Sequence, residues 1–263
     1  MKTSLIVTTF NRPDALKMVL NSIFLQKVMP DEIIIADDGS GNSTKQMLAE
    51  FNNKKLGLKI IHSWQKNLGF RAARSRNRAI ALSSGDYIIL IDGDMILDRF
   101  FIEDHIVNSE IGCFIQGKRV LLSENLTKQA ILSGGLKVNF FSSGFKNKKN
   151  MLRSKFLMKF ASRKGFFSSG IKTCNMSFFR NDFISVNGFN NFFEGWGRED
   201  SEFVERLFNS GIKRKDLRFG AIQYHLYHNE SSRDMLSVND ELLDFTISKK
   251  LKICKDGVNR FIK

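Results

Sequence analysis

The stretch that most constrains the fold is Tyr87-Ile-Ile-Leu-Ile-Asp-Gly-Asp-Met95. Four consecutive apolar residues, three of them isoleucine, are typical of a strand buried on both faces of a parallel sheet. The strand is expected to end at Asp92 and Asp94, two carboxylates separated by Gly93. Such a pair is favourable when a divalent cation lies beside it, since hard oxygen ligands suit Mg²⁺ or Mn²⁺, and the glycine lets the backbone approach a ligand closely. The alternative is a simple polar turn after a strand.

Strands and helices alternate through the first 92 residues. The pattern predicts strands at 4–10, 31–40 and 58–62, and helices that begin at Pro13 and cover 44–51 and 70–82. Thr8, Asp38 and Asp92 all fall at carboxyl ends of predicted strands, the edge at which open α/β sheets bind ligands. The fold class is therefore predicted as α/β, with a doubly wound, Rossmann-like nucleotide-binding half.

The positive charge of the chain is concentrated in one segment. The net charge is +14, and residues 118–180 hold 14 Lys and Arg against a single acid, Glu124, which gives 14 − 1 = +13. A segment of this kind favours a polyanion: nucleic acid, anionic lipid or an anionic acceptor. A solvated lysine-rich face is the alternative.

Size and composition restrict the setting. A chain of 263 residues can form one large domain, and the three cysteines show no metal-binding spacing and fit a reducing compartment. We see no signal peptide and no run of about 20 apolar residues that could span a membrane. The expected location is the cytoplasm, either free or peripheral on the inner face of the plasma membrane.

The second half of the chain contains Phe193-Glu-Gly-Trp-Gly-Arg-Glu-Asp-Ser-Glu-Phe203. Trp196 offers an apolar plane for a sugar ring, and Gly195 lets the backbone pass close to a ligand. Glu199 and Asp200 fall where a helix is expected to begin, and the helix dipole there favours ionised carboxylates that could act as a base. The alternative is ordinary acids at a helix N-terminus beside a core tryptophan.

Two of the four histidines, His225 and His228, stand three residues apart, more than 100 residues beyond Asp94. Imidazole binds Mn²⁺, although less readily than carboxylate does. The pair is therefore a candidate to complete a metal site with Asp94.

The motifs of the first half resemble those of the inverting, sugar-nucleotide-dependent family 2 glycosyltransferases. The resemblance rests on VTTFNRP, DDGS, NLGFRAARSRN and DGD. It implies the GT-A fold, with a mixed central sheet, and UDP-sugar as the donor. It implies that Thr8 and Asp38 contact the uracil, Asp92 the ribose, and Asp94 a metal on the diphosphate. The remaining residues expected to bind the nucleotide sugar are Phe10, Arg71, Arg76 and Gly93.

The GWG motif followed by Glu-Asp resembles the acceptor side of β-1,4-galactosyltransferases and chondroitin-polymerase-type enzymes. The resemblance implies Asp200 as the general base and Glu199 as a residue that helps to hold the acceptor hydroxyl. His228 matches the histidine of the family's Met-x-x-His metal pair, and His225 takes the place of the methionine, so His228 is ranked first as a ligand. The residues expected to contact the acceptor are Trp196, Gly195 and Asn175.

We therefore expect a single GT-A domain over residues 1–263. It comprises a nucleotide-sugar-binding half (1–117), a basic insert (118–170) with a helix near 150–161, an acceptor half (171–232) and a helical tail (233–263). The expected reaction moves a hexose or N-acetylhexosamine from a UDP-sugar, with Mn²⁺ or Mg²⁺, to a saccharide or glycolipid acceptor in surface polysaccharide or lipooligosaccharide synthesis. The alternatives are a sugar-nucleotide nucleotidyltransferase and a non-enzymatic polyanion-binding protein. An anionic membrane surface is a further expected partner, and nucleic acid is the least favoured one.

Overall fold

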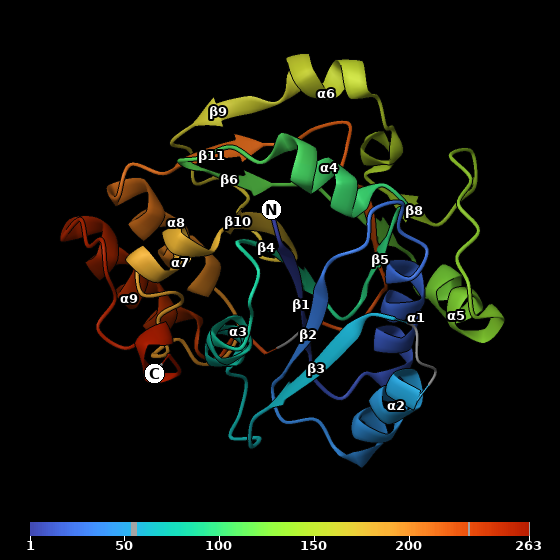
Figure 1. Ribbon diagram of the computed structural model, residues 1–263, viewed down its shortest axis with the longest axis horizontal. Helices are drawn as coiled ribbons and strands as arrows, with labels where there is room; N and C mark the ends of the chain where they lie inside the picture. Colours follow the sequence, from blue (N-terminus) through green and yellow to red (C-terminus); the bar gives the residue numbers. More distant parts are fainter. Residues whose placement is uncertain (54–56, 231, 263) are drawn as a thin grey trace.

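A computed structural model describes residues 1–53, 57–230 and 232–262, and its centre is an eight-stranded mixed sheet (Figure 1). In spatial order the strands are β3 (Lys59–Trp64), β2 (Glu32–Asp37), β1 (Thr3–Thr9), β4 (Tyr87–Asp92), β10 (Asn175–Phe179), β6 (Cys113–Gln116), β11 (Lys213–Asp216) and β9 (Arg163–Gly165). The first four are parallel, whereas β10 runs antiparallel to both β4 and β6. The predicted α/β class, the Rossmann-like half and the mixed sheet are confirmed.

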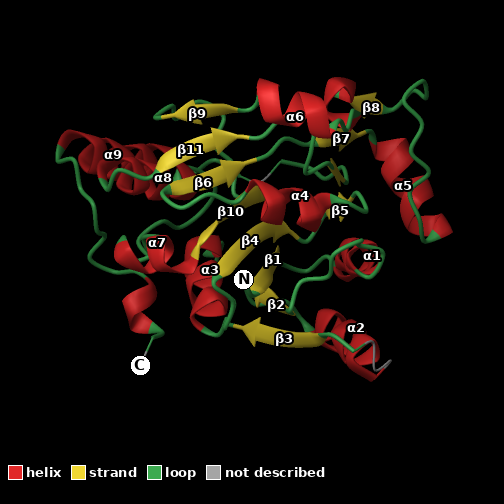
Figure 2. Cartoon of the chain, turned by 45° about the horizontal axis from the view of Figure 1, so that its top comes forward, coloured by secondary structure: helices red, strands yellow, loops and turns green. Residues whose placement is uncertain are grey.

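Helices cover both faces of the sheet (Figure 2). They are α1 (Pro13–Ile23), α2 (Asn42–Asn53), α3 (Ala72–Ala81), α4 (Phe101–Asn108), α5 (Glu124–Ser133), α6 (Lys155–Ala161), α7 (Arg180–Ser185), α8 (Glu199–Asn209) and α9 (Leu236–Ser248), with 3₁₀ turns η1 (Lys148–Met151) and η2 (Val258–Arg260). Side chains of β1 alternate between two cores: Leu5 and Val7 pack with α1, α2 and α4, and Ile6 packs with α3, α7 and α8. Burial on both faces explains the apolar runs within β1, β2 and β4.

The parallel register places the carboxyl ends of the first strands side by side. Thr8 pairs with Ala36 of β2 on one side and with Asp92 of β4 on the other. The polar residues that follow each strand, Asp38 and Asp94 among them, therefore gather at one edge of the sheet.

A second, four-stranded sheet brings the histidine segment to this edge. Its order is β5 (Met95–Leu97), β12 (Gln223–His225), β7 (Val120–Leu122) and β8 (Phe145–Lys146). His225 pairs with Met95 in the antiparallel β5–β12 ladder, and the Leu226 N–H donates to the Asp94 carbonyl at 2.9 Å. A pairing across 130 residues of sequence thus fixes both histidines beside the Asp-Gly-Asp turn.

The segment 118–170 is built from several short elements, and it supplies strands to both sheets. The single helix expected near 150–161 is wrong in its first half: η1 ends at Met151 and α6 begins at Lys155. The interruption has a local cause, because the Ser154 hydroxyl accepts from the Leu157 N–H at 3.2 Å and so caps the start of α6. In the described part of the chain no helix is both long and apolar enough to cross a bilayer.

Candidate active site

A cavity of about 1080 Å³ opens at the carboxyl ends of β1, β2 and β4. Its lining includes most of the residues singled out in the sequence: Thr8, Phe10, Asp38, Arg76, Asp92, Gly93, Asp94, Trp196, His225 and His228. The size is sufficient for a ligand as large as a sugar nucleotide. The structure therefore brings the predicted donor residues and the tryptophan of the GWG motif into one space.

The end of the cavity near β2 is shaped by Asp38. Its carboxylate accepts from the Arg71 backbone N–H and from the Gln65 side-chain amide, both at 2.6 Å. Burial raises the pKa of Asp38, although these two hydrogen bonds oppose the shift. The carboxylate is thus held in a fixed orientation at the cavity wall.

Arg76 connects the two halves of the site. Its guanidinium, almost fully buried, donates to the Thr8 hydroxyl at 3.1 Å, to Asp92 at 3.3 Å and to Glu199 at 3.0 Å. Burial alone would lower the pKa of Arg76, but the charges of Asp92, Glu199 and Asp200 outweigh it and raise the pKa. A buried cation that is shared in this way fixes the donor-side residues relative to the start of α8.

Gly93 is closely packed against the end of β1. A Cβ at this position would lie 3.0 Å from the Thr8 carbonyl oxygen, and the Gly93 N–H donates to the same oxygen at 2.7 Å. The lack of a side chain therefore lets the backbone between Asp92 and Asp94 lie directly against the end of β1, where a Cβ would be crowded.

Asp94, His225 and His228 form a compact cluster. Both histidine Nε2 atoms lie 3.5 Å from Asp94 Oδ2, and the three ligand atoms lie within 4.8 Å of one another. Arg12 also reaches this carboxylate, with Nη1 at 2.7 Å from Oδ2. Burial opposes ionisation of Asp94, but the hydrogen bond and charge of His225, with Arg12 and His228, outweigh it and lower the pKa.

The donor set of this cluster fits a divalent metal. Asp94 Oδ1 is buried and has no hydrogen-bond partner among the described residues. His228 Nδ1 lies 2.6 Å from the Asn229 carbonyl, which can only accept, so Nδ1 donates there and Nε2 is the ring nitrogen that faces Asp94, the one a metal would use. The ranking of His228 above His225 is not reflected in the geometry, because the two distances to Asp94 are equal.

Asp200 and Glu199 occupy the first turn of α8, as predicted. Burial, followed by the negative charge of Glu199, raises the pKa of Asp200 to about 7, against the opposing effects of the Ser201 N–H, Arg76 and Lys172. With a pKa of about 7, Asp200 is about half ionised at neutral pH, which is less than the helix dipole alone predicts. Desolvation and a like charge exceed the dipole, whose effect is about 0.3–1 kcal/mol.

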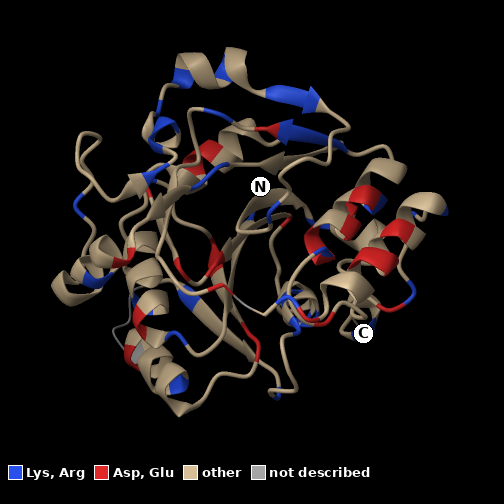
Figure 3. Cartoon of the chain, turned by 180° about the vertical axis from the view of Figure 1, so that it is seen from behind, with Lys and Arg blue, Asp and Glu red and all other residues tan. Residues whose placement is uncertain are grey.

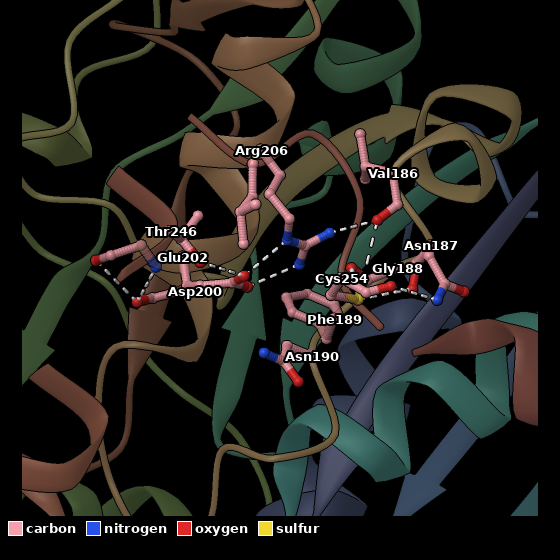
Figure 4. Close-up of polar contacts among 12 residues, drawn as sticks. Val186, Asn187, Gly188, Phe189, Asn190, Asp200, Glu202, Arg206, Thr246 and Cys254 are labelled. Atoms are coloured by element: carbon pink, nitrogen blue, oxygen red, sulfur yellow. Dashed lines mark hydrogen bonds and ion pairs between the residues drawn. The ribbon is translucent and has the colours of Figure 1, made fainter. Parts of the chain in front are cut away.

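A rigid frame lies behind these carboxylates (Figure 4). Arg206, fully buried, donates to both oxygens of Glu202 at 2.7–2.8 Å and also to the Val186 carbonyl. Thr246 of α9 donates to the same glutamate at 3.1 Å. These contacts tie α8 to the 186–189 turn and to α9, so the first turn of α8 has a fixed position.

The GWG turn places Trp196 at the cavity wall. Gly195 has a φ of +71°, its N–H donates to the Phe70 carbonyl at 2.9 Å, and a Cβ there would collide with Met235. The indole is 40% exposed, and the Arg233 guanidinium lies 5.1 Å from its ring. An exposed indole plane is suited to stacking on a sugar ring.

Five of the predicted residues do not line the cavity: Glu199, Asp200, Gly195, Arg71 and Asn175. Glu199 contacts the lining residue Arg76, Asp200 follows Glu199, and Gly195 precedes Trp196, whereas Arg71 and Asn175 are engaged elsewhere. The Arg71 side chain points to the Lys66 carbonyl and not into the cavity, so only its backbone N–H takes part, through Asp38. Asn175 is buried, with its amide donating to the Lys118 and Ala221 carbonyls and accepting from His105. All its polar atoms are engaged in the interior, so it stabilises the fold behind the site.

The cavity also has basic lining residues that the motif analysis missed: Arg12, Arg119, Lys146 and Arg233. A signal existed for Arg12, since it follows the end of β1 by three residues and so belongs to the ligand-binding edge. The other three come from loops and from β8, and their approach depends on tertiary contacts that no local pattern encodes.

Comparisons with known proteins agree with this geometry. The family model for glycosyl transferase family 2 matches residues 4–185, and that for the N-terminal domain of galactosyltransferase matches residues 157–229. Hyaluronan synthase from Pasteurella multocida is 27% identical over 98% of this chain and 29% of its own length. Chondroitin synthase from Escherichia coli is 24% identical over 84% of this chain and 34% of its own length. The chain thus spans about a third of the length of each of these two relatives.

A solved structure of S. aureus TarS in complex with UDP-GlcNAc superposes with a TM-score of 0.62 at 18% identity, over 95% of this chain and 69% of that one. This likeness, together with the order and directions of the strands, establishes a GT-A-like fold. The resemblance read from the sequence motifs is confirmed in both of its parts. The chain belongs to glycosyl transferase family 2.

Proposed function

We propose that this chain is an inverting glycosyltransferase that moves a hexose or N-acetylhexosamine from a UDP-sugar to a hydroxyl of a saccharide or glycolipid acceptor. One observation carries the proposal. Arg76 links Asp92, on the donor side of the cavity, to Glu199, at the start of the helix that carries Asp200, through contacts of 3.3 and 3.0 Å. A binding edge for a nucleotide and a candidate base are thereby held in one rigid unit.

On the donor side, Thr8 and Asp38 are proposed to contact the uracil and Asp92 the ribose. Carboxylates suit these roles, because they accept hydrogen bonds from an imide N–H and from hydroxyls. Hydrogen bonds from the Gln65 amide and the Arg71 N–H already fix the orientation of Asp38, so its side chain needs little reordering when the uracil binds.

We propose that Asp94, His225 and His228 hold the divalent metal. When bound, it would neutralise charge on the leaving UDP. Two imidazole nitrogens beside one carboxylate are softer than the all-oxygen set preferred by Mg²⁺, so we propose Mn²⁺ as the better fit. Arg12, whose guanidinium contacts the same carboxylate, adds a positive charge at the place where phosphate groups would lie.

On the acceptor side, Trp196 is proposed to stack on the acceptor sugar and Asp200 to remove the proton from its hydroxyl. A pKa of about 7 makes Asp200 a strong enough base to accept a proton while leaving about half of it ionised at pH 7. Glu199, held by Arg76, is proposed to hold the hydroxyl. One in-line displacement then inverts the anomeric carbon, and no covalent nucleophile is required.

The pathway and location are proposed as well. Synthesis of a surface polysaccharide or lipooligosaccharide accords with the named activities of the relatives, and a cytoplasmic site accords with three buried, free cysteines.

The decisive experiment measures UDP release from a panel of UDP-hexoses and UDP-N-acetylhexosamines, with and without mixed oligosaccharide acceptors. Acceptor-dependent UDP release, with an inverted anomer in the product by NMR coupling, supports the proposal. Asp200→Asn is the matched variant, because it should lose transfer while it still binds UDP. Pyrophosphate release from UTP and a sugar phosphate would instead identify a nucleotidyltransferase, and a retained anomer would exclude single displacement.

A further inference from the structure

The longest acid-free part of the chain runs from residue 125 to residue 181 and contains 12 Lys and Arg. Figure 3 shows that basic residues gather over α6, β9 and η1, at one end of the molecule. Among the described residues, Lys149 and Lys159 are exposed and form no salt bridge. Cations without internal partners are available to an external anion.

Exposed phenylalanines lie among these cations. Phe156 and Phe160, one helical turn apart on α6, are 70% and 68% exposed, and their rings pack at 4.8 Å. On the opposite side of the helix Met158 is 3% exposed and joins the main core. The core thus anchors α6 from below and holds the two rings outward, beside Lys155 and Lys159.

We propose that this surface, formed by Phe156 and Phe160 with Lys149 and Lys159, binds an anionic lipid bilayer. Apolar rings flanked by unpaired lysines complement an interface whose headgroups are negative and whose acyl region is apolar. An acidic protein partner would complement the charge of the lysines, but it offers no comparable apolar layer into which two adjacent rings could insert. The inference is independent of the transfer reaction, since none of these residues lines the cavity.

The same surface continues toward the cavity along the chain. Lys146 lines the cavity, and η1, with Lys148 and Lys149, follows it and leads to α6. A bilayer bound at α6 would therefore lie near one rim of the cavity. If the proposed transfer is correct, an acceptor attached to a lipid could present its sugar there.

The test is co-sedimentation of the full chain with vesicles of phosphatidylglycerol and phosphatidylcholine, with pure phosphatidylcholine as reference. Lys149→Gln/Lys159→Gln should weaken partitioning by about fivefold per lysine, on the order of 25-fold together. The matched control, Lys45→Gln/Lys249→Gln, changes two exposed lysines on α2 and after α9 and should bind as the wild type does. Binding should also fall between about 0.1 M and about 1 M salt, as the Debye length shortens from about 10 to about 3 Å.

A second measurement does not depend on removing charge. Phe160→Trp places a reporter at the centre of the surface, and its emission should shift to shorter wavelength when anionic vesicles are added. No shift in a folded variant, or equal binding by the two double-lysine variants, would overturn the proposal. Salt-sensitive binding of single-stranded DNA without vesicle binding would also overturn it and would identify nucleic acid as the partner.

Discussion

The reaction should depend on the charge state of Asp200 in a way that the structure makes quantitative. Asp200→Asn keeps the shape of the side chain and its hydrogen bond from the Ser201 N–H but removes the proton acceptor. Because general-base catalysis contributes about 10²–10⁴-fold, kcat should fall by that range while UDP-sugar affinity stays close to the wild-type value. The assay is acceptor-dependent UDP release, with donor affinity measured separately by calorimetry.

The pH profile tests the same assignment in the wild type. With a pKa of about 7, Asp200 is mostly protonated at pH 6 and mostly ionised at pH 8. The rate should therefore rise about tenfold between these values if the ionised carboxylate is the base. A rate that is flat from pH 6 to pH 8 would refute the assignment.

Glu199→Gln should move this profile in a defined direction. The charge of Glu199 is the second cause of the raised pKa of Asp200, after burial. Its removal, which also leaves Arg76 with one fewer anionic partner, should shift the acid limb to lower pH, though not to the ordinary value of 3.8, because burial remains. The Glu199→Gln variant should change the KM for the acceptor more than it changes kcat. An inactive Glu199→Gln variant together with an active Asp200→Asn variant would reverse the two roles.

The raised pKa also predicts a stability cost. A carboxyl group whose pKa is higher in the folded state than in the unfolded state favours folding at low pH, and this contribution is lost as pH rises through the folded pKa. For a pKa of about 7 against 3.8, ionisation at pH 8 costs at most about 4 kcal/mol of unfolding free energy. Asp200→Asn should therefore be more stable than wild type at pH 8 and nearly equal below about pH 4, by urea unfolding. A variant that is less stable at pH 8 would show that the carboxylate is better solvated than its burial indicates.

Three further outcomes concern the proposed metal site. Asp94→Ala should abolish transfer, and EDTA should inhibit the wild type with Mn²⁺ restoring activity; full turnover in a chelated, metal-free preparation would contradict this. His225→Ala and His228→Ala should each weaken Mn²⁺ binding by at least about tenfold, because removing one ligand costs more than losing an outer-shell partner; equal affinities in both variants and wild type, by Mn²⁺ electron paramagnetic resonance, would exclude the histidines. Arg12→Met removes a cation that competes for Asp94, so Mn²⁺ should bind more tightly in the absence of nucleotide, and weaker binding by the same method would show that Arg12 supports the site.

The donor half of the site could be predicted from the sequence because local pattern and topology agree there. Continuous apolar runs, as expected for strands buried on both faces, locate β1, β2 and β4. Because parallel strands bind ligands at their carboxyl ends, Thr8, Asp38 and Asp92 are placed at one edge. These residues come together because each lies at the carboxyl end of a parallel strand.

The rest depends on long-range packing. Arg119 and Arg233 reach the cavity from loops, and the burial of Asn175 follows from partners on three distant segments. The pKa of Asp200 could not be predicted either, because desolvation by surrounding elements decides it and not the helix position visible in the sequence. Sequence motifs thus locate the carboxylates, whereas only the fold gives their charge state.

The shared position of Arg76 leads to a last prediction, that donor binding activates the base. The guanidinium contacts both Asp92 and Glu199. If Asp92 turns to the ribose when UDP-sugar binds, Arg76 is left more fully to α8, and its positive charge lowers the pKa of Asp200. The acid limb of kcat, which reports the bound enzyme, should then lie at lower pH than that of kcat/KM with respect to donor, which reports the free enzyme. Arg76→Lys keeps the charge but cannot contact Thr8, Asp92 and Glu199 together, so it should reduce the separation between the two limbs. Coincident limbs in the wild type would mean that the donor and acceptor sides titrate independently.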